Sequence, residues 1–182
     1  MSQLKPFIET DRLYLEKLSL KHCQNYYLNW LHDQGVNQFL ETGHIPNDLK
    51  QLEEFINSIN PDEIFLAIHT KSENKHIGNI RLHSLNPKHG LAEYGIMIGD
   101  KESWGNGYAK EATTSLLDHC FQKLNIRKIT LGVVEENIGA LKMYEKLGFL
   151  QEGLLANHCF YNGAYKNIVR MALFQKDWLN AK

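Results

Sequence analysis

The sequence IGDKESWGNGYA at residues 98–109 has the composition of a strand end, a loop with three glycines and the start of a helix. Glycine adopts backbone conformations that are closed to other residues, and it lets the main chain approach a ligand closely. The first turn of a helix offers unpaired N–H groups and a partial positive charge, which together favour an anion such as a diphosphate. Many loops of this form bind nothing. The stretch contains neither GxGxxG nor a Gly-Lys-Ser/Thr sequence, so it is neither a dinucleotide fingerprint nor a Walker loop.

A long amphipathic pattern follows the loop and predicts a helix with one face in the core. Its apolar positions keep the i, i+3, i+4, i+7 spacing over four turns. They are Ala109, Ala112, Thr113, Leu116, Leu117, Cys120, Phe121 and Leu124. A buried strand is expected next, at residues 128–134. Asn137 then caps a second helix that ends at Leu147-Gly148, where Gly148 suits the left-handed cap position.

The flanking segments complete the expected order of elements. Asp48 is a candidate cap for its helix, and Asn162-Gly163 is a hairpin turn signal between the last two strands. The loop at residues 86–90 favours an antiparallel pairing of the strands on either side of it. The remaining helices are expected at 20–32 and 48–59, and the remaining strands at 13–15, 64–69, 76–83, 91–98, 149–156 and 169–174.

This order of elements, βααβββαβαββ, defines the expected fold class. Helices interleave with strands, while at least two strand pairs are expected to be antiparallel. The sequence therefore predicts an α/β (α+β) fold with a mixed, largely antiparallel central sheet flanked by helices.

The composition is typical of a globular protein. The chain has 182 residues, of which 43% are hydrophobic and 23% are charged, so we expect one domain over residues 1–182 with a sizeable core. Lys and Arg number 20 and Asp and Glu 21, which gives a net charge of −1. Because no basic excess exists, contacts with a phosphate backbone cannot dominate, and we expect no nucleic-acid partner.

The cysteines, histidines and apolar runs indicate the environment of the protein. The three cysteines are scattered and form no CxxC pair, and the nine histidines include no HxH or HExxH pair, so neither a disulfide framework nor a metal site is expected. No run approaches the roughly 18 apolar residues of a membrane span, and residues 1–20 lack a signal-peptide pattern. We therefore expect a soluble cytoplasmic protein that does not bind membranes and is a monomer or a homodimer.

A second motif changes the interpretation of the glycine loop. The sequence NIGALKMYEKLGF at residues 137–149 begins one strand after the first long helix ends. Together with WGNGYAKEA at residues 104–112 it resembles the GNAT superfamily of acetyl-CoA-dependent N-acetyltransferases, most closely the RimJ/RimL-like branch. The resemblance runs from about Thr10 to the region of Gly153, which is nearly the whole chain.

The resemblance implies an acetyl-CoA site. In the family, N–H groups of the loop hold the diphosphate of CoA, and the pantetheine arm lies along the strand before the loop. Asn137 corresponds to a residue that contacts the cofactor arm, and Tyr144 to one near the thioester sulfur. Asn106 replaces a frequent basic residue, and Lys101 or Lys110 could compensate for the lost charge. The cofactor-binding residues implied in this way are Ile96, Met97, Ile98, Trp104, Gly105, Asn106, Gly107, Tyr108, Ala109, Lys110, Asn137, Ala140 and Tyr144.

Amide formation from a thioester sets the expected catalytic roles. An alkyl amine with a pKa near 10.4 is mostly protonated at neutral pH, so a base or a water chain must remove a proton before attack. Tyr144 is the candidate acid for the leaving thiolate, since a phenol stays protonated near pH 7; the alternative is a core aromatic residue. Glu93 is the leading candidate base, with a solvated strand-edge charge as its alternative. His83 is a second candidate base, with a structural histidine as its alternative.

The acceptor is left open by the sequence. The resemblance places acceptor specificity near the first helices and the last hairpin. The candidate lining residues there are Trp30, His32, Asp33, Glu41, His44, His158, Tyr161 and Tyr165, and His83 of the strand at 76–83 is a further candidate. The acceptor is either a protein N-terminal amine, as the RimJ/RimL resemblance implies, or a small-molecule amine, including the amino sugar of a nucleotide used in surface-polysaccharide synthesis. A non-catalytic acyl-CoA-binding module and a plain α/β interaction domain are the alternatives from other classes.

Overall fold

The computed structural model describes residues 5–42 and 45–181. Its strands form one eight-stranded sheet in the order β1-β2-β3-β4-β5-β6-β8-β7, and the mixed, largely antiparallel sheet predicted from the sequence is confirmed. The strands are β1 (Ile8–Glu9), β2 (Leu13–Lys17), β3 (Ile64–Thr70), β4 (His76–Asn86), β5 (Leu91–Ile98), β6 (Lys128–Val134), β7 (Leu150–Tyr161) and β8 (Ala164–Phe174). The helices are α1 (Leu28–His32), α2 (Gln34–Asn37), α3 (Leu49–Ser58), α4 (Tyr108–Lys123), α5 (Ile138–Lys146) and α6 (Gln175–Asn180).

The chain divides into two compact units. The first comprises the described residues up to Leu82 together with Gly95–Leu117, and the second comprises His83–Tyr94 and the described residues from Asp118 onward. Strands β4 and β5 contribute residues to both. In the described part of the chain, no helix is long and apolar enough to cross a membrane.

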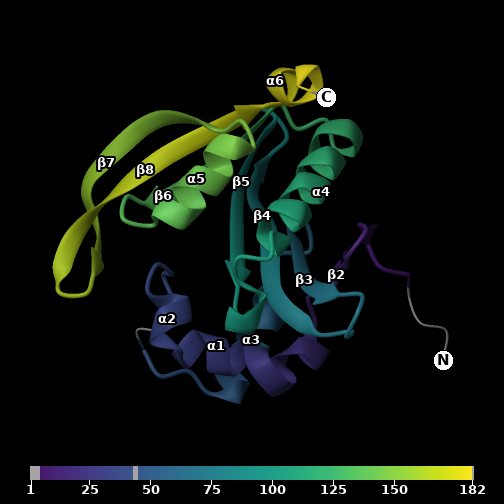
Figure 1. Ribbon diagram of the computed structural model, residues 1–182, viewed down its shortest axis with the longest axis vertical. Helices are drawn as coiled ribbons and strands as arrows, with labels where there is room; N and C mark the ends of the chain where they lie inside the picture. Colours follow the sequence, from purple (N-terminus) through teal and green to yellow (C-terminus); the bar gives the residue numbers. More distant parts are fainter. Residues whose placement is uncertain (1–4, 43–44, 182) are drawn as a thin grey trace. The chain divides into compact units, whose positions relative to one another are not determined.

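The first unit is built on the antiparallel ladder of β1, β2, β3 and the start of β4. Helices α1, α2 and α3 gather at one end of these strands (Figure 1). Their apolar faces close a cluster in which Tyr27, Trp30, Leu52 and Phe65 are all buried. Burial of side chains of this size stabilises each by about 1.5–3 kcal/mol relative to exposure, which explains why such short helices are stable here.

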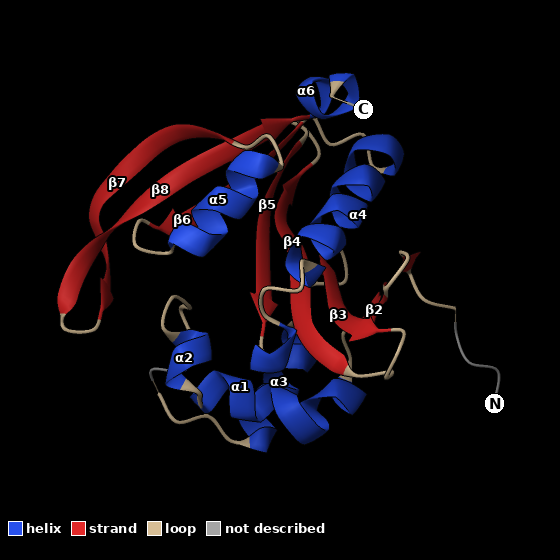
Figure 2. Cartoon of the chain, in the orientation of Figure 1, coloured by secondary structure: helices blue, strands red, loops and turns tan. Residues whose placement is uncertain are grey.

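The second unit is dominated by a long curved hairpin formed by β7 and β8 (Figure 2). Strand β8 also pairs antiparallel with β6, and β6 pairs in parallel with β5. The Asn162-Gly163 turn predicted from the sequence is confirmed, because both residues have positive φ values, 51° and 79°, as a two-residue hairpin turn requires. Phe149 and Leu131 are fully buried in this unit.

The helix ends follow the capping signals of the sequence. The Asp48 carboxylate accepts a hydrogen bond from the N–H of Gln51 at 2.8 Å, and the Asn137 side chain accepts one from the N–H of Ala140 at 3.2 Å. Gly148 has a φ of +89°, the left-handed conformation that favours glycine after a helix. All three predicted caps are therefore confirmed.

The segment at residues 20–32 differs from the single helix that its pattern predicts. It consists of a 3-10 turn, η1 (Leu20–His22), a π-helical turn, η2 (Cys23–Tyr27), and then α1. The imidazole of His22 turns back to the N–H of Ser19 at 2.9 Å and closes the tight first turn. Strand β7 also extends beyond the predicted 149–156, past an irregularity where Asn157 has a φ of +50°.

Candidate active site

The glycine loop lies in the first unit and presents main-chain donors at the start of α4. The first helical hydrogen bond runs from the N–H of Glu111 to the carbonyl of Gly107 at 3.1 Å. The N–H groups of residues 107–110 therefore have no partner within the helix. Gly105 and Gly107 have φ values of +76° and +78°, which residues with a side chain rarely adopt, and a Cβ on Gly105 would meet no atom within 4 Å. This is an open, positively polarised helix start that fits a diphosphate.

Arg12, from the start of the chain, holds this loop in place. Its guanidinium donates to the carbonyl of Asn106 at 2.9 Å and to the carboxylate of Glu111 at 2.6 Å, and it lies over the ring of Tyr108 at 4.6 Å. Thr10 donates a further hydrogen bond to Glu111 at 2.6 Å. Partial burial alone would raise the pKa of Glu111, but the hydrogen bonds from Thr10 and Arg12 outweigh it and hold that pKa below its ordinary value.

Side chains within and next to the loop fix its shape further. The indole N–H of Trp104 donates to the carbonyl of Ile98 at 2.8 Å, and the Asn106 amide donates to the carbonyl of Glu102 at 3.1 Å. Lys101 forms a 2.6 Å ion pair with Asp33. The charge of Lys101 is therefore already paired, and Lys110, which is exposed, is the better candidate to compensate for the missing basic residue at Asn106.

The last part of the strand that precedes the loop, from Gly95 to Ile98 of β5, also belongs to the first unit. Ile96, Met97 and Ile98 are half-buried on β5. A Cβ on Gly78 would lie only 2.2 Å from the carbonyl oxygen of Met97, and one on Gly99 only 2.0 Å from the Trp30 ring. Both glycines are therefore required for the close packing that fixes the end of β5 before the loop.

Tyr144 lies in the second unit, on α5, in an aromatic cluster. Its ring centroid lies 5.9 Å from that of Tyr94 and 5.7 Å from that of Phe149. Burial raises the pKa of the Tyr144 phenol above its ordinary value, so the group remains a proton donor at neutral pH. Asn137 caps the same helix through its bond to the N–H of Ala140, so these two predicted cofactor residues interact with each other in α5.

Glu93, the leading candidate base, is held in an ion pair in the second unit. Its carboxylate oxygen Oε1 accepts a hydrogen bond from the Arg170 guanidinium at 2.6 Å, and both side chains are about one-third exposed. Glu93 sits beside Thr130 of β6, and β6 pairs in turn with the strand that carries Arg170. The sequence left a solvated strand-edge charge as the alternative to a catalytic role for Glu93. The structure shows instead that the carboxylate is paired with Arg170, so the alternative to catalysis is a structural ion pair.

The candidate acceptor-lining residues fall into different environments. Trp30 and Tyr161 are buried, and Trp30 belongs to the apolar cluster of the first unit. His32 and Glu41 are exposed, and the imidazole of His32 accepts a hydrogen bond from the N–H of Asn47 at 3.3 Å. His83 is half-buried with Nδ1 at 3.1 Å from the Ser84 hydroxyl. His44 lies outside the described residues.

Sequence reasoning missed Arg12, Thr10 and Asp33 as supports of the loop. Arg12 and Asn106 are separated by 94 positions, so no local pattern links them. One feature of the sequence could have pointed to Thr10 and Arg12 as supports of the loop: the resemblance to the acetyltransferases begins at these residues.

The comparisons with known proteins identify the class to which this fold and loop belong. Residues 12–150 match the model of the acetyltransferase (GNAT) domain. The chain therefore belongs to the GNAT acetyltransferase family.

Particular relatives are named for polyamine acetylation. The chain is similar to spermidine N(1)-acetyltransferase of Vibrio cholerae, with 39% identity over 57% of this chain and 60% of that protein. It also matches the Escherichia coli K12 enzyme of the same name, with 38% identity over 62% of this chain and 64% of that protein. The chain thus spans less than two-thirds of the length of these curated relatives.

Two longer matches complete the comparison. The uncharacterized N-acetyltransferase p20 of Bacillus licheniformis is 27% identical over 93% of this chain and 96% of that protein. The crystal structure of spermidine N-acetyltransferase from Vibrio cholerae in complex with CoA and spermine has a TM-score of 0.83 and 29% identity, and the match covers 94% of this chain and all of that one.

Proposed function

We propose that this chain is an acetyl-CoA-dependent N-acetyltransferase that moves an acetyl group directly to a primary amine. The observation that carries the proposal is the open set of N–H groups at residues 107–110, set by two positive-φ glycines in a chain of the GNAT family. Acetyl-CoA supplies an activated acyl group as a thioester. The loop residues Gly105–Lys110 would bind its diphosphate, because the unpaired donors and the helix dipole favour an anion there.

In the proposed reaction the amine nitrogen forms a bond to the acyl carbon, and the carbon–sulfur bond breaks. Tyr144 gives its phenolic proton to the departing sulfur, and a base or a water chain takes the proton that the amine loses. No cysteine lies in either motif, and burial raises the pKa of the Cys120 thiol to about 12. A thiolate at Cys120 is therefore scarce at neutral pH, which supports direct transfer over a covalent acetyl-enzyme.

We further propose Glu93 as the residue that accepts the amine proton. The rival is a purely structural role in the Arg170 ion pair, and two variants separate the roles. Glu93→Gln and Arg170→Ala both remove the ion pair, so a structural role predicts similar losses of thermal stability and similar kcat values. A base role predicts that Glu93→Gln lowers kcat by roughly 100-fold or more while Arg170→Ala leaves kcat within a few-fold of the wild type.

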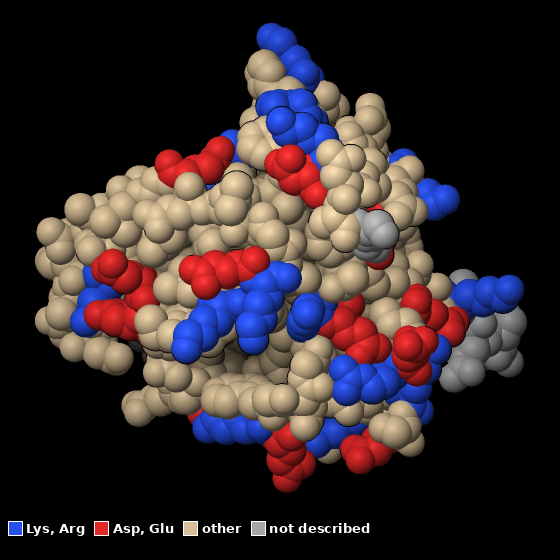
Figure 3. All heavy atoms as spheres, turned by 45° about the horizontal axis from the view of Figure 1, so that its top comes forward, with Lys and Arg blue, Asp and Glu red and all other residues tan. Residues whose placement is uncertain are grey.

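For the acceptor we propose a small-molecule polyamine. Support comes from relatives that are named spermidine N(1)-acetyltransferases and from the structural neighbour crystallised with spermine. A protein N-terminal amine, which the RimJ/RimL resemblance implies, and an amino-sugar nucleotide are the competing acceptors. Acidic and basic side chains are interspersed on the face of the molecule in Figure 3, in keeping with the net charge of −1.

An acceptor screen tests the proposed function. Purified protein is supplied with acetyl-CoA, and release of CoA is followed with spermidine and spermine, with short peptides that have free N-termini, and with amino-sugar nucleotides. We expect the highest kcat/KM with the polyamines. A higher value with peptides or amino sugars would move the acceptor to that class. Tight binding of CoA without turnover of any amine would instead indicate a non-catalytic acyl-CoA-binding module, and no thermal shift with acetyl-CoA would indicate an interaction domain.

The remaining properties are proposals of the same kind. We propose that one transferase domain spans residues 1–182, and that the protein works in the cytoplasm as a monomer or a homodimer without a nucleic-acid or membrane partner. Gel filtration with light scattering measures the oligomeric state, and cell fractionation measures the location.

A further inference from the structure

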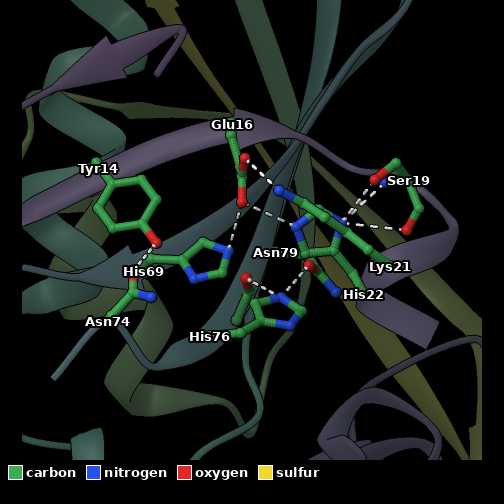
Figure 4. Close-up of polar contacts among 10 residues, drawn as sticks. Tyr14, Glu16, Ser19, Lys21, His22, His69, Asn74, His76 and Asn79 are labelled. Carbon is green, nitrogen blue, oxygen red and sulfur yellow. Dashed lines mark hydrogen bonds and ion pairs between the residues drawn. The ribbon is translucent and has the colours of Figure 1, made fainter. Parts of the chain in front are cut away.

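A cluster of histidines and one glutamate lies in the first unit, apart from the glycine loop. It draws on β2, η1, β3 and β4, and Figure 4 shows the side chains converging. The carboxylate oxygen Oε1 of Glu16 lies 3.2 Å from Nε2 of His22 and 3.3 Å from Nε2 of His69. His22 and His69 are only 4% and 7% exposed. The three ligand-type atoms all lie within 4.8 Å of one another.

His69 is not satisfied by its protein neighbours. Within residues 5–42 and 45–181, neither ring nitrogen of His69 completes a hydrogen bond of ordinary geometry, and neither does the hydroxyl of the adjacent Thr70. Leaving a buried polar atom without a partner is unfavourable by about 1–3 kcal/mol. A ligand that accepts a nitrogen lone pair would satisfy one of the two ring nitrogens of His69.

We propose that Glu16, His22 and His69 form a binding site for a divalent transition-metal ion, with Zn²⁺ as the ion that fits best. Tetrahedral zinc with bonds of 2.0–2.1 Å places its ligand atoms about 3.3 Å apart, which matches both distances from Glu16. Two imidazoles and one carboxylate are a common donor set for zinc. Bringing the two imidazoles to the same spacing requires movements on the order of 1 Å, and a fourth position remains for water.

The protonation of the imidazoles is compatible with this role. Burial is the main cause that lowers the pKa of His69 to about 4, and burial also lowers the pKa of His22. Both rings are therefore neutral at pH 7, as metal ligands must be. Nδ1 of His22 lies 3.1 Å from the carbonyl oxygen of Ser19. In the structure Nδ1 also lies where it accepts the N–H of Ser19, at 2.9 Å, and that tautomer carries its proton on Nε2 beside Glu16. Metal binding therefore requires the other tautomer, in which Nδ1–H donates to the Ser19 carbonyl and the Nε2 lone pair is left for the metal.

The other groups that face the site do not prevent binding. Lys21 pairs with the second oxygen of Glu16 at 2.7 Å, but its side chain is 62% exposed and can turn toward solvent. The His76 ring stacks on His69 with centroids 5.1 Å apart. Desolvation is the main cause that lowers the pKa of His76 to about 4, so it adds no charge at pH 7. The ring of Tyr14 also stacks on His69, with centroids 4.7 Å apart, and it supports the imidazole without adding a charge.

This site departs from the expectation of no metal, and the reason is its construction. His22 and His69 come from different elements, so a search for closely spaced histidines cannot detect them. Because the three ligands belong to β2, η1 and β3, a bound ion would cross-link the start of the helical segment to the sheet. The expected consequence is a more stable first unit, independent of acetyl transfer.

Metal binding by the whole chain tests the proposal. Tag-free protein is stripped with a chelator and titrated with Zn²⁺ in a calorimeter, with Mg²⁺ as a comparison, and melting is followed in parallel. We expect one Zn²⁺ per chain, a rise in melting temperature with Zn²⁺, and no response to Mg²⁺, which prefers oxygen ligands. Loss of a ligand in His69→Ala should weaken Zn²⁺ binding by roughly 100-fold or more.

Two further variants keep this test decisive. Glu16→Gln keeps the shape of the side chain, so it can replace His69→Ala in this test if His69→Ala does not fold. Glu16→Gln should also abolish the Zn²⁺-dependent rise in melting temperature. His158→Ala removes an exposed histidine of the second unit and should bind Zn²⁺ like the wild type. The proposal is overturned if the wild type binds no Zn²⁺, if Glu16→Gln binds it as tightly as the wild type, or if His158→Ala loses the binding.

Discussion

The loop at residues 104–110 presents main-chain N–H groups at an exposed helix start, whereas Tyr144 presents one phenol buried among aromatic rings. The loop donors are positioned by glycine conformations and by Arg12, and they are several and similar. The phenol is single, and burial keeps its proton in place. Several exposed donors suit the binding of an anion, while one protected proton suits a chemical step. We therefore expect variants of the loop to change KM for acetyl-CoA and variants at Tyr144 to change kcat.

The largest expected effect is that of Tyr144→Phe on turnover. The substitution removes the proposed proton donor and keeps the ring that packs on Tyr94 and Phe149. A general acid contributes about 10²–10⁴-fold to a rate, so kcat should fall by roughly 100-fold or more while the Kd for CoA stays within twofold. Steady-state kinetics and calorimetry measure the two quantities.

Tyr94→Phe is the matched control for this prediction. It removes a hydroxyl from a buried ring of the same aromatic cluster. A kcat for Tyr144→Phe no lower than that of Tyr94→Phe would mean that Tyr144 is a packing residue. The proposed division between a loop that binds the cofactor and a phenol that takes part in the chemical step would then be wrong.

The next effect is that of Gly107→Ala on cofactor binding. A residue with a side chain is strained at a φ of +78°, so the main chain should shift at the first turn of α4. Each hydrogen bond to a charged group contributes about 1.5–3 kcal/mol, so displacing one donor should raise KM for acetyl-CoA by roughly 10- to 100-fold. The expected change in kcat is small once the enzyme is saturated with acetyl-CoA.

Gly163→Ala separates strain from binding. Gly163 has nearly the same φ, +79°, and a Cβ added to it would meet no atom within 4 Å, but it lies in the hairpin turn. Both variants should lose about 1 kcal/mol of stability, and only Gly107→Ala should raise KM. Equal KM values for the two variants would contradict a role of the loop in binding.

The same two regions show what the sequence could predict. The loop, the Asn137 cap and the Gly148 cap depend on residues that are neighbours in the chain, so local patterns predicted them. The Arg12–Asn106 and Glu93–Arg170 contacts join segments that meet only after the strands have paired, and the pattern of β5 or of the loop contains no sign of them. The segment at residues 20–32 keeps a helical spacing of apolar residues, yet the His22–Ser19 contact converts its first turn to a 3-10 turn.

A smaller effect is expected from Arg12→Ala, which tests whether the loop needs its distant support. The variant removes the donor to Asn106 and the contact over Tyr108. Because the Arg12 side chain is 49% exposed, solvent screens its ion pair, and we expect a stability loss of at most about 1 kcal/mol. KM for acetyl-CoA should rise by roughly 3- to 10-fold, since the loop donors are held less firmly.

Arg127→Ala serves as the comparison for Arg12→Ala. Arg127 is an exposed arginine over an aromatic ring, Phe174 at 5.8 Å, and it lies in the second unit. It should lose a similar amount of stability without a change in KM. If Arg12→Ala and Arg127→Ala had the same KM for acetyl-CoA, Arg12 would not be needed to position the loop. The glycines and the start of α4 would then be sufficient to fix its shape.

The smallest expected effect is a pH dependence of stability that originates at Glu111. Because the folded-state pKa of Glu111 is lower than its ordinary value of 4.5, its ionised form stabilises the fold at neutral pH. This contribution is complete above the unfolded-state pKa and is lost as the pH falls through the folded-state pKa. Glu111→Gln should therefore flatten the decrease in unfolding free energy between pH 6 and pH 3 by a few tenths to about 1 kcal/mol, as measured by urea denaturation at each pH. If the unfolding free energy of Glu111→Gln depended on pH as steeply as that of the wild type, the contacts of Glu111 with Thr10 and Arg12 would contribute nothing to stability. Only the glycine conformations would then distinguish this loop from an ordinary helix start.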